Sequence, residues 1–155
     1  MSKTNAVRII EKLNIEYEVV EYEWDEENID ALSVAEKLNA NPETVFKTLI
    51  ARNEKNEILV FVIPGNYELN LKKAALASGS KKVELINQKE LLPLTGYIRG
   101  GCSPVGMKKL YPSFIDESSE LFENIFVSSG RRGAQMKIDP KVLIEIINAE
   151  KTDLI

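Results

Sequence analysis

The sequence predicts one α/β domain built on a curved, mixed β-sheet, and two observations lead to this prediction. The chain has 155 residues, of which 44% are hydrophobic, and it contains no linker of low complexity, so its length fits a single domain with a sizeable core. Segments with the apolar spacing of a helix alternate along the chain with segments of strand period, without an internal repeat. Such alternation is typical of α/β folds.

The first part of the chain predicts a helix, a strand and a second, short helix. Residues 4–14 carry apolar side chains at helical spacing, namely Val7, Ile10 and Leu13. Residues 15–22 alternate between apolar and acidic side chains, which predicts a half-buried strand. Residues 33–36 read Ser-Val-Ala-Glu, a capping box that opens a short helix through Leu38, and the Asn-Pro pair at 41–42 starts a further turn.

The middle of the chain predicts a hairpin followed by a helix. Residues 45–51 and 58–63 are apolar strands joined by a short polar connection. Asn70 can accept hydrogen bonds from the first amides of a helix over residues 71–78, and Gly79 suits the position just after its end.

Shorter elements complete the prediction. Residues 83–86 and 125–127 are expected to form strands, and residues 88–92 a short helix. The pair Asp139 and Pro140 caps a last helix, on which Val142, Leu143, Ile146 and Ile147 form an apolar stripe.

Residues 95–109 form the most unusual segment, because four glycines and a proline stand where core-forming side chains would be expected. Glycine lets a backbone amide approach a ligand closely, and Pro104 fixes its own backbone dihedral angle. A tight turn between strands would explain a single glycine pair. The flanking charges of Arg99, Lys108 and Lys109 favour instead a loop that binds an anionic or carbonyl-bearing ligand through its amides.

The composition excludes several kinds of site. The chain has no histidine and one cysteine, which excludes Ser-His-Asp and Cys-His catalysis, zinc-histidine sites and intramolecular disulfides. We therefore expect neither a metal nor a cofactor. The N-terminal residues run directly into the first predicted helix and do not resemble a signal peptide, so we expect a cytoplasmic protein without a membrane segment.

The charges are unevenly distributed around a net charge of −4. Acidic side chains crowd into residues 21–30 and 116–123, whereas basic side chains occur in adjacent pairs at 72–73, 81–82, 108–109 and 131–132. Each pair is compatible with a solvated surface, but several pairs together could form an anion-binding face that the net charge does not reveal.

Lys47 interrupts the apolar strand predicted over residues 45–51. A lysine in such a position commonly protects an edge strand or reaches to the surface with its ammonium group. A functional role is the alternative, because lysine is seldom buried without a partner.

Three segments together resemble the YbaK/EbsC family of free-standing Cys-tRNA(Pro) deacylases, relatives of the editing domain inserted in bacterial prolyl-tRNA synthetases. They are Phe-Lys-Thr-Leu at 46–49, the glycine-rich segment at 96–106, and Val-Ser-Ser-Gly-Arg-Arg-Gly at 127–133. The resemblance extends over nearly the whole chain. It implies one deacylase domain over residues 1–155 with a barrel-like sheet, and hydrolysis of the ester between a misattached amino acid and the 3′-terminal ribose of a tRNA.

The resemblance also implies roles for individual residues. Lys47 would orient the terminal adenosine or the ester, and the Gly101 amide would hold the scissile carbonyl and stabilise its developing charge. The substrate pocket would further include Tyr22, Phe46, Thr48, Gly100, Ser103, Pro104, Ser129 and Gly130. We expect the basic pairs Lys108, Lys109, Arg131 and Arg132 to contact tRNA phosphates, although they could also be solvated surface charges.

The sequence departs from the family pattern at two positions, where Gln135 replaces an aspartate and Trp24 replaces a histidine. Gln135 carries no charge, which leaves the recognition of the substrate amino group open. Cys102 lacks a histidine base, so we interpret it as a small apolar residue. We expect the substrate thiol itself to act as nucleophile.

Two alternatives to Cys-tRNA(Pro) editing remain open at this point. One is editing of another mischarged tRNA, such as Ala-tRNA(Pro), and the other is a catalytically inactive module that binds tRNA ends or aminoacyl-nucleotides. Docking on prolyl-tRNA synthetase is also left open. We expect a monomer, because no long exposed apolar stripe requires a partner.

Overall fold

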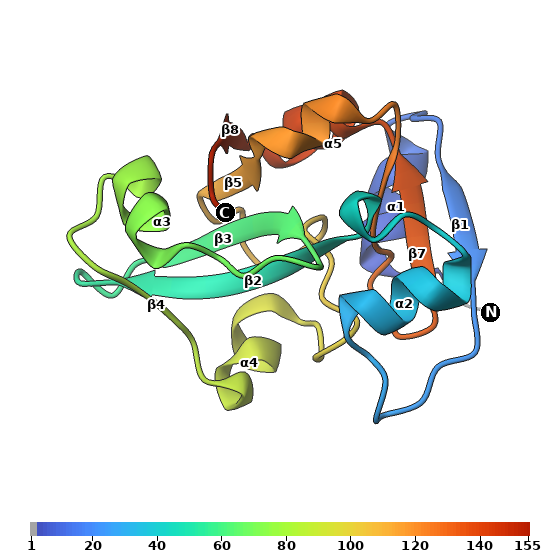
Figure 1. The fold of residues 1–155 in the computed structure, drawn as a ribbon, viewed down its shortest axis with the longest axis horizontal. Helices are drawn as coiled ribbons and strands as arrows, with labels where there is room; N and C mark the ends of the chain where they lie inside the picture. Colours follow the sequence, from blue (N-terminus) through green and yellow to red (C-terminus); the bar gives the residue numbers. More distant parts are fainter. Residues whose placement is uncertain (1–2) are drawn as a thin grey trace.

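The computed structural model describes residues 3–155, which form five α-helices, three 3₁₀-helices and eight strands (Figure 1). The α-helices are α1 (Asn5–Lys12), α2 (Ala31–Leu38), α3 (Leu71–Ser78), α4 (Leu91–Thr95) and α5 (Pro140–Ile147). The 3₁₀-helices are η1 (Pro42–Thr44), η2 (Gln88–Glu90) and η3 (Glu117–Leu121). Within the described part of the chain, no helix is long and apolar enough to cross a bilayer.

The strands form two open sheets. They are β1 (Glu18–Glu21), β2 (Phe46–Asn53), β3 (Ile58–Pro64), β4 (Val83–Leu85), β5 (Ser113–Asp116), β6 (Ile125–Ser128), β7 (Ala134–Ile138) and β8 (Glu150–Thr152). A three-stranded antiparallel sheet has the order β1-β7-β6, and a five-stranded mixed sheet has the order β4-β2-β3-β5-β8, with β5 parallel to both of its neighbours.

The α/β class and the mixed sheet are confirmed, but the expected barrel-like closure is not observed. Among residues 3–155 the two sheets are connected by a single bridge, between Val45 and Phe126. One bridge does not continue a ladder, because β2 and β6 share no further register pair. The sheets therefore stay separate and leave space between them on one side of β2.

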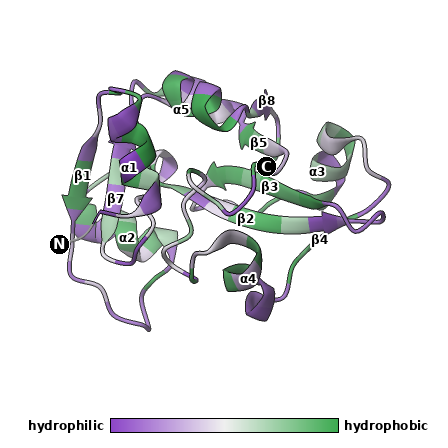
Figure 2. Cartoon of the chain, turned by 180° about the vertical axis from the view of Figure 1, so that it is seen from behind, coloured by the Kyte–Doolittle hydropathy of each residue, from purple (hydrophilic) through white to green (hydrophobic). Residues whose placement is uncertain are grey.

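The core lies on both faces of the β2–β3 pair, whose strands are apolar along most of their length (Figure 2). One cluster joins these strands to α1, α5 and the smaller sheet. A second cluster packs them against α3, where the rings of Phe61 and Phe114 stack with centroids 5.3 Å apart. Burial on both faces explains why β3 is a continuous hydrophobic run rather than an alternating one.

Most of the predicted helix starts are confirmed. Thr4, Asn41, Asn70 and Asp139 each accept a hydrogen bond from an amide at the start of the following helix. The capping box predicted at 33–36 is wrong, because Asp30 caps α2 and accepts hydrogen bonds from both the amide and the hydroxyl of Ser33. The strand predicted over 15–22 is shorter and comprises only β1.

Candidate functional site

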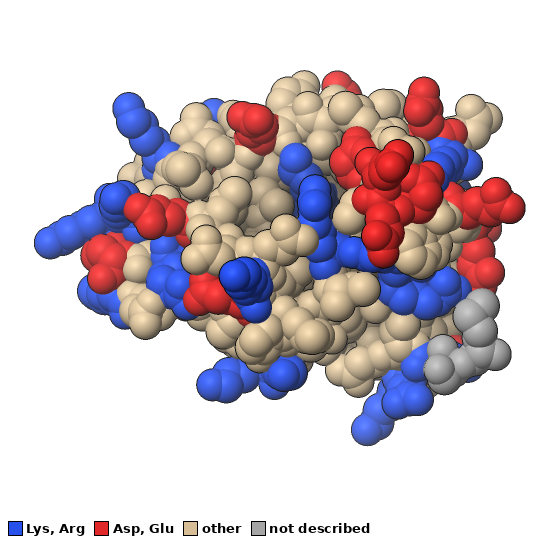
Figure 3. Space-filling view, turned by 90° about the horizontal axis from the view of Figure 1, so that it is seen from below, with Lys and Arg blue, Asp and Glu red and all other residues tan. Residues whose placement is uncertain are grey.

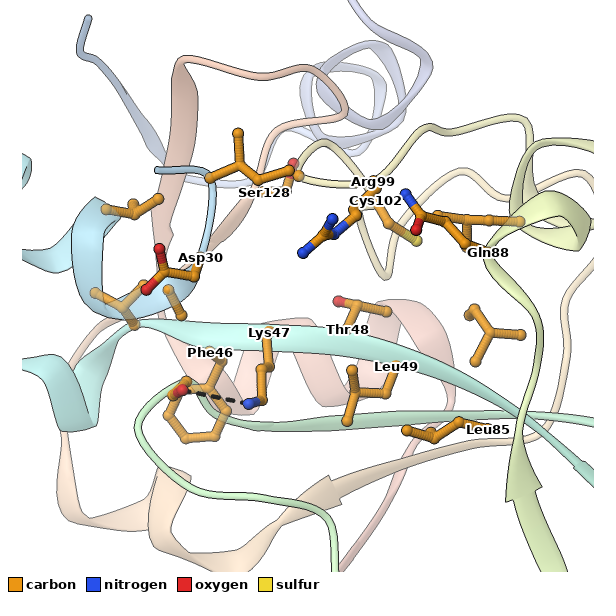
Figure 4. A pocket seen from close by; sticks show the side chains of 18 of the residues that line it. Asp30, Phe46, Lys47, Thr48, Leu49, Leu85, Gln88, Arg99, Cys102 and Ser128 are labelled. Carbon is orange, nitrogen blue, oxygen red and sulfur yellow. Dashed lines mark hydrogen bonds between the residues drawn. The ribbon is translucent and has the colours of Figure 1, made fainter. Parts of the chain in front are cut away.

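A cavity of about 440 Å³ opens beside the first half of β2. Strand β4 pairs only with Ala51–Asn53, so residues 46–50 have a strand partner on the β3 side alone. The start of α2, the glycine-rich loop and the ends of β6 and β7 close the remaining sides. The cavity residues with polar or ionisable side chains are Gln135 and seven residues labelled in Figure 4: Asp30, Lys47, Thr48, Gln88, Arg99, Cys102 and Ser128.

Lys47 is half-buried in the wall of this cavity. Its ammonium donates a hydrogen bond to the carbonyl of Gly65, with 3.3 Å between the two atoms (Figure 4). Burial lowers the pKa of Lys47, and the negative charges of Glu68 and Asp30 partly oppose this effect. The ammonium retains donors beyond this one bond, so the cation can bind a ligand in the cavity.

Thr48 presents an unpaired polar group to the same cavity. Its side chain points into the space between β2 and the glycine-rich loop (Figure 4). Thr48 Oγ1 is buried and has no hydrogen-bond partner among residues 3–155. An orphaned buried hydroxyl is uncommon in a folded protein, because desolvation without a hydrogen bond is costly. A polar ligand atom bound here would satisfy it.

The glycine-rich loop is held against the second glycine-bearing loop. The Gly101 amide donates to the carbonyl of Ile98 at 2.9 Å. A Cβ atom on Gly101 would lie 3.1 Å from the backbone of Arg131, so the two loops touch where only glycine fits. Gly101 is therefore buried between the loops and does not line the cavity.

The neighbours of Gly101 line the cavity instead. Gly100 and Cys102 are both part of its wall, and neither of their amides donates to a protein acceptor among the described residues. The role that the resemblance gives to the Gly101 amide thus fits these two flanking amides better.

Among residues 3–155, no three cysteine, aspartate or glutamate side chains converge in a way that could hold a metal ion.

Cys102 lines the cavity as a protonated thiol. Burial raises the pKa of Cys102 to about 12, against a smaller lowering effect from its hydrogen bond with Thr95. A nucleophilic cysteine needs a lowered pKa, because the thiolate is the reactive form. The structure therefore supports the interpretation of Cys102 as an apolar wall residue.

Of the residues predicted for the substrate pocket, Lys47, Phe46, Thr48 and Gly100 line the cavity. The others do not line it and have structural contacts. The Ser103 hydroxyl accepts from the Val105 amide, and the Ser129 hydroxyl donates to the Ala134 carbonyl. Pro104 lines a separate, smaller cavity, and Gly130 packs against Thr4 and Tyr97.

Tyr22 lies one layer behind the cavity. Its hydroxyl accepts a weak hydrogen bond from Gln135 Nε2, at 3.5 Å, and Gln135 is a buried residue of the cavity wall. Tyr22 can thus orient Gln135 without touching a bound ligand in this conformation.

The predicted tRNA-binding residues fall into two groups. Arg131 forms an ion pair with Glu21 at 3.1 Å, and Arg132 donates to the Arg99 carbonyl at 2.8 Å and lies 3.9 Å from Glu26. Both arginines are therefore engaged within the protein. The second group, Lys108 and Lys109, is exposed on the surface and does not line the cavity.

Six cavity residues with polar or ionisable side chains were not among the predicted site residues: Asp30, Gln88, Arg99, Cys102, Ser128 and Gln135. Ser128 is adjacent to the predicted Ser129, and it is paired with Gln135 in the β6–β7 ladder, a register that the sequence does not display. Asp30 belongs to an acidic run in which no single carboxylate stands out, and Arg99 was noted only as a flanking charge.

Comparison with known proteins identifies the family. Residues 26–146 match the family described as the aminoacyl-tRNA editing domain, and the chain belongs to this family. It is 44% identical over 152 residues, 98% of this chain and 93% of its relative, to EbsC of Enterococcus faecalis, which is named as a candidate Cys-tRNA(Pro)/Cys-tRNA(Cys) deacylase.

Two further similarities connect the chain to prolyl-tRNA synthetase. A proline–tRNA ligase of Brachyspira hyodysenteriae is 28% identical over 99 residues, which are 64% of this chain and 17% of the ligase. The crystal structure of a candidate trans-editing enzyme for prolyl-tRNA synthetase superposes with a TM-score of 0.83 at 25% identity, and the match covers 99% of this chain and 98% of that one.

Proposed function

We propose that this chain, as one monomeric domain over residues 1–155, is a trans-editing deacylase that cleaves the aminoacyl ester of Cys-tRNA(Pro). One observation carries the proposal: a single cavity combines the Lys47 cation, the unpartnered Thr48 hydroxyl and the free amides of Gly100 and Cys102. These groups suit an ester and the negative charge that develops on its carbonyl oxygen. Membership of the editing-domain family and the 44% identity to EbsC support it.

The cavity offers positioning rather than a general base. Burial keeps Cys102 protonated, and the hydrogen bonds from Ser33 lower the pKa of the Asp30 carboxyl, which makes it a weak base. The thiol of the bound cysteinyl group then attacks its own carbonyl carbon. The new carbon–sulfur bond forms, the ester bond breaks, and the ribose oxygen takes up the thiol proton; water hydrolyses the released thiolactone. Holding the reacting atoms together supplies the rate enhancement.

Asp30 gives the substrate ammonium group a counter-charge. Asp30 is the one carboxylate among the described residues that line the cavity, and Gln135 in the same wall is neutral. An α-ammonium group placed next to Lys47 alone would be repelled, whereas Asp30 offsets this repulsion. We therefore place the amino group of the cysteinyl ester toward the start of α2.

The test compares ester loss from four substrates under the same conditions: Cys-tRNA(Pro), Cys-tRNA(Cys), Ala-tRNA(Pro) and Ser-tRNA(Pro). The proposal expects rapid loss of both cysteinyl esters and slow loss of the other two, because alanine and serine lack the thiol. Fast hydrolysis of Ala-tRNA(Pro) would indicate editing of a different amino acid. Stability of all four esters, with retained tRNA binding, would indicate a non-catalytic module.

The variant Asp30→Asn tests the position of the ammonium group. Asparagine caps helices about as well as aspartate, so α2 should remain intact while the charge is lost. We expect KM for Cys-tRNA(Pro) to rise and the thermal midpoint to change little. A KM equal to that of the unaltered protein would place the ammonium group elsewhere.

A further inference from the structure

Trp24 does not line the cavity, and it is held in place by its neighbours although 44% of it is exposed. A Cβ atom on Gly133 would come within 2.5 Å of Trp24 Cδ1, and Gly133 has a φ of +82° that favours glycine. The second glycine-bearing loop thus makes room for the indole ring. The ring thus combines a fixed orientation with an exposed aromatic surface, which is what the stacking of a nucleic-acid base needs.

Arg132 connects the Trp24 ring to the cavity. Its guanidinium lies over the ring, 5.3 Å from the centroid, and its Nε donates to the Arg99 carbonyl at 2.8 Å. The Arg132 side chain also packs against Gly100, where a Cβ atom would be 3.4 Å from Arg132 Cγ. Since Arg99 and Gly100 both line the cavity, the ring stands one side chain away from the cavity wall.

The charges around the ring favour one particular kind of ligand. Arg131 forms an ion pair with Glu21, and Arg132 lies 3.9 Å from Glu26, whereas Arg99 has no ion pair among residues 3–155 and points into the cavity (Figure 4). Figure 3 shows basic side chains at the border of the hollow and acidic side chains gathered beside them. A double helix carries closely spaced phosphates on both strands, which the acidic patch would repel. An unpaired nucleotide needs only one cation and one aromatic face.

We propose that Trp24 and Arg99 form a subsite for an unpaired nucleotide of the tRNA 3′ end. The base next to the esterified terminal nucleotide stacks on the exposed part of the Trp24 ring, and the phosphate between the two nucleotides contacts Arg99. Arg132 holds the ring in this orientation and acts as a positioning residue. This inference rests on the proposed function for the identity of the strand, but binding at the subsite requires no ester.

The chain provides its own probe for this subsite, because Trp24 is its single tryptophan. Uncharged tRNA(Pro) is titrated into the protein while tryptophan fluorescence is recorded, and the anisotropy of labelled tRNA is followed in parallel. We expect the fluorescence to be quenched with the same midpoint as the anisotropy change. The same tRNA trimmed of its unpaired 3′ nucleotides should bind more weakly and leave the fluorescence unchanged.

Kinetics of the variants then separate binding from chemistry. Trp24→Ala should raise KM for Cys-tRNA(Pro) about 5- to 150-fold, the range for losing one stacked base, with little change in kcat. Trp24→Phe should restore most of the affinity, because it restores an aromatic face. The matched control Leu76→Ala removes a side chain that is 84% exposed on α3 and should leave KM unchanged.

Two results would overturn the subsite. One is tRNA binding, seen by anisotropy, without any change in tryptophan fluorescence; this measurement needs no variant and holds even if Trp24→Ala fails to fold. The other is an unchanged KM in a folded Trp24→Ala protein. The proposed function fails separately: quenching by tRNA without ester cleavage would retain the subsite and reject the deacylase.

Discussion

The Lys47 side chain lines the cavity, and its ammonium donates a hydrogen bond to the carbonyl of Gly65. The neighbouring Thr48 offers a hydroxyl that no residue from 3 to 155 satisfies. These two side chains alternate along β2, yet both reach the cavity because the strand has no partner on one side at this point. Two adjacent residues thus contribute a cation and a hydrogen-bonding group to the cavity wall.

Replacing Lys47 by alanine should reduce kcat/KM for Cys-tRNA(Pro) by about 100-fold or more, since a charge-assisted hydrogen bond to the ester is lost. The fold should persist, because Lys47 packs only partly into the core. The exposed Lys55, altered in the same way, serves as the control. Comparable turnover by a folded Lys47→Ala protein would contradict the role of Lys47.

The lowered pKa of Lys47 adds a pH dependence with a defined sign. The charged form of a lysine is lost as the pH rises through its pKa, and burial moves this pKa below the ordinary 10.5. The Lys47-dependent part of the activity should therefore decline on the alkaline side at a pH below 10.5. A pH–rate profile on a slowly self-hydrolysing ester analogue would measure this decline.

Cys102 should be chemically silent in the folded protein. With a pKa of about 12, its thiolate fraction at pH 8 is on the order of 10⁻⁴. A thiol reagent should modify it slowly under native conditions and rapidly after unfolding, and Cys102→Ser should keep most of the activity. Rapid native modification combined with an inactive, folded Cys102→Ser protein would instead identify an enzyme nucleophile.

At the scale of the elements, the site depends on two loops that pack backbone to backbone. The loop before Ser103 and the loop between β6 and β7 meet at Gly101, where a side chain would come 3.1 Å from the backbone of Arg131. Contact between the loops fixes the flanking amides of Gly100 and Cys102 in the cavity wall. Gly101 therefore packs the two loops together, while Gly100 and Cys102, whose amides have no protein acceptor among residues 3–155, line the cavity.

Gly101→Ala should push the two loops apart, lower the stability by about 1–3 kcal/mol as overpacking does, and reduce kcat. The matched control is Gly79→Ala at the end of α3, where φ is +65° and nothing lies within 4 Å of the added methyl group. The control should lose about 1 kcal/mol of stability through its strained backbone but keep its activity. If the two variants lose the same stability and also the same activity, the loss of activity in Gly101→Ala does not come from the loop contact.

At the scale of the whole molecule, the charge pattern separates basic groups that are free from those that are already paired. Arg131 and Arg132 form ion pairs with Glu21 and Glu26. Replacing the two arginines by glutamate would therefore disturb the loops in addition to removing positive charge. Lys108 and Lys109 are exposed and are the better test of long-range attraction to tRNA.

Binding of tRNA should weaken as the salt concentration rises, and Lys108→Glu with Lys109→Glu should flatten this dependence, by a slope change of about 0.7–0.9 per lost phosphate contact. The control pair Lys55→Glu and Lys72→Glu alters exposed lysines at the hairpin end and on α3, at the far end of the molecule from α2 (Figure 1). An unchanged slope in the first pair would show that Lys108 and Lys109 are only solvated charges.

Local sequence patterns correctly predicted the features that depend on residues close together along the chain. Asn70 caps α3 and Gly79 ends it, because capping and left-handed backbone geometry involve residues close along the chain. The β2–β3 hairpin follows equally from two apolar runs and a short connection. Lys47 could also be singled out from the sequence, because it interrupts an apolar strand, and the structure places it in the cavity wall.

Tertiary structure alone decided which distant groups meet. The ion pair between Glu21 and Arg131 joins residues 110 positions apart, a pairing that the sequence alone does not show. Strand β8 is a short polar segment without alternation, and it exists only because β5 offers it a parallel edge. Hydrogen-bond register and loop packing place Ser128 in the cavity and Ser129 behind it. Such pairings are selected by contacts across the fold, which no local pattern encodes.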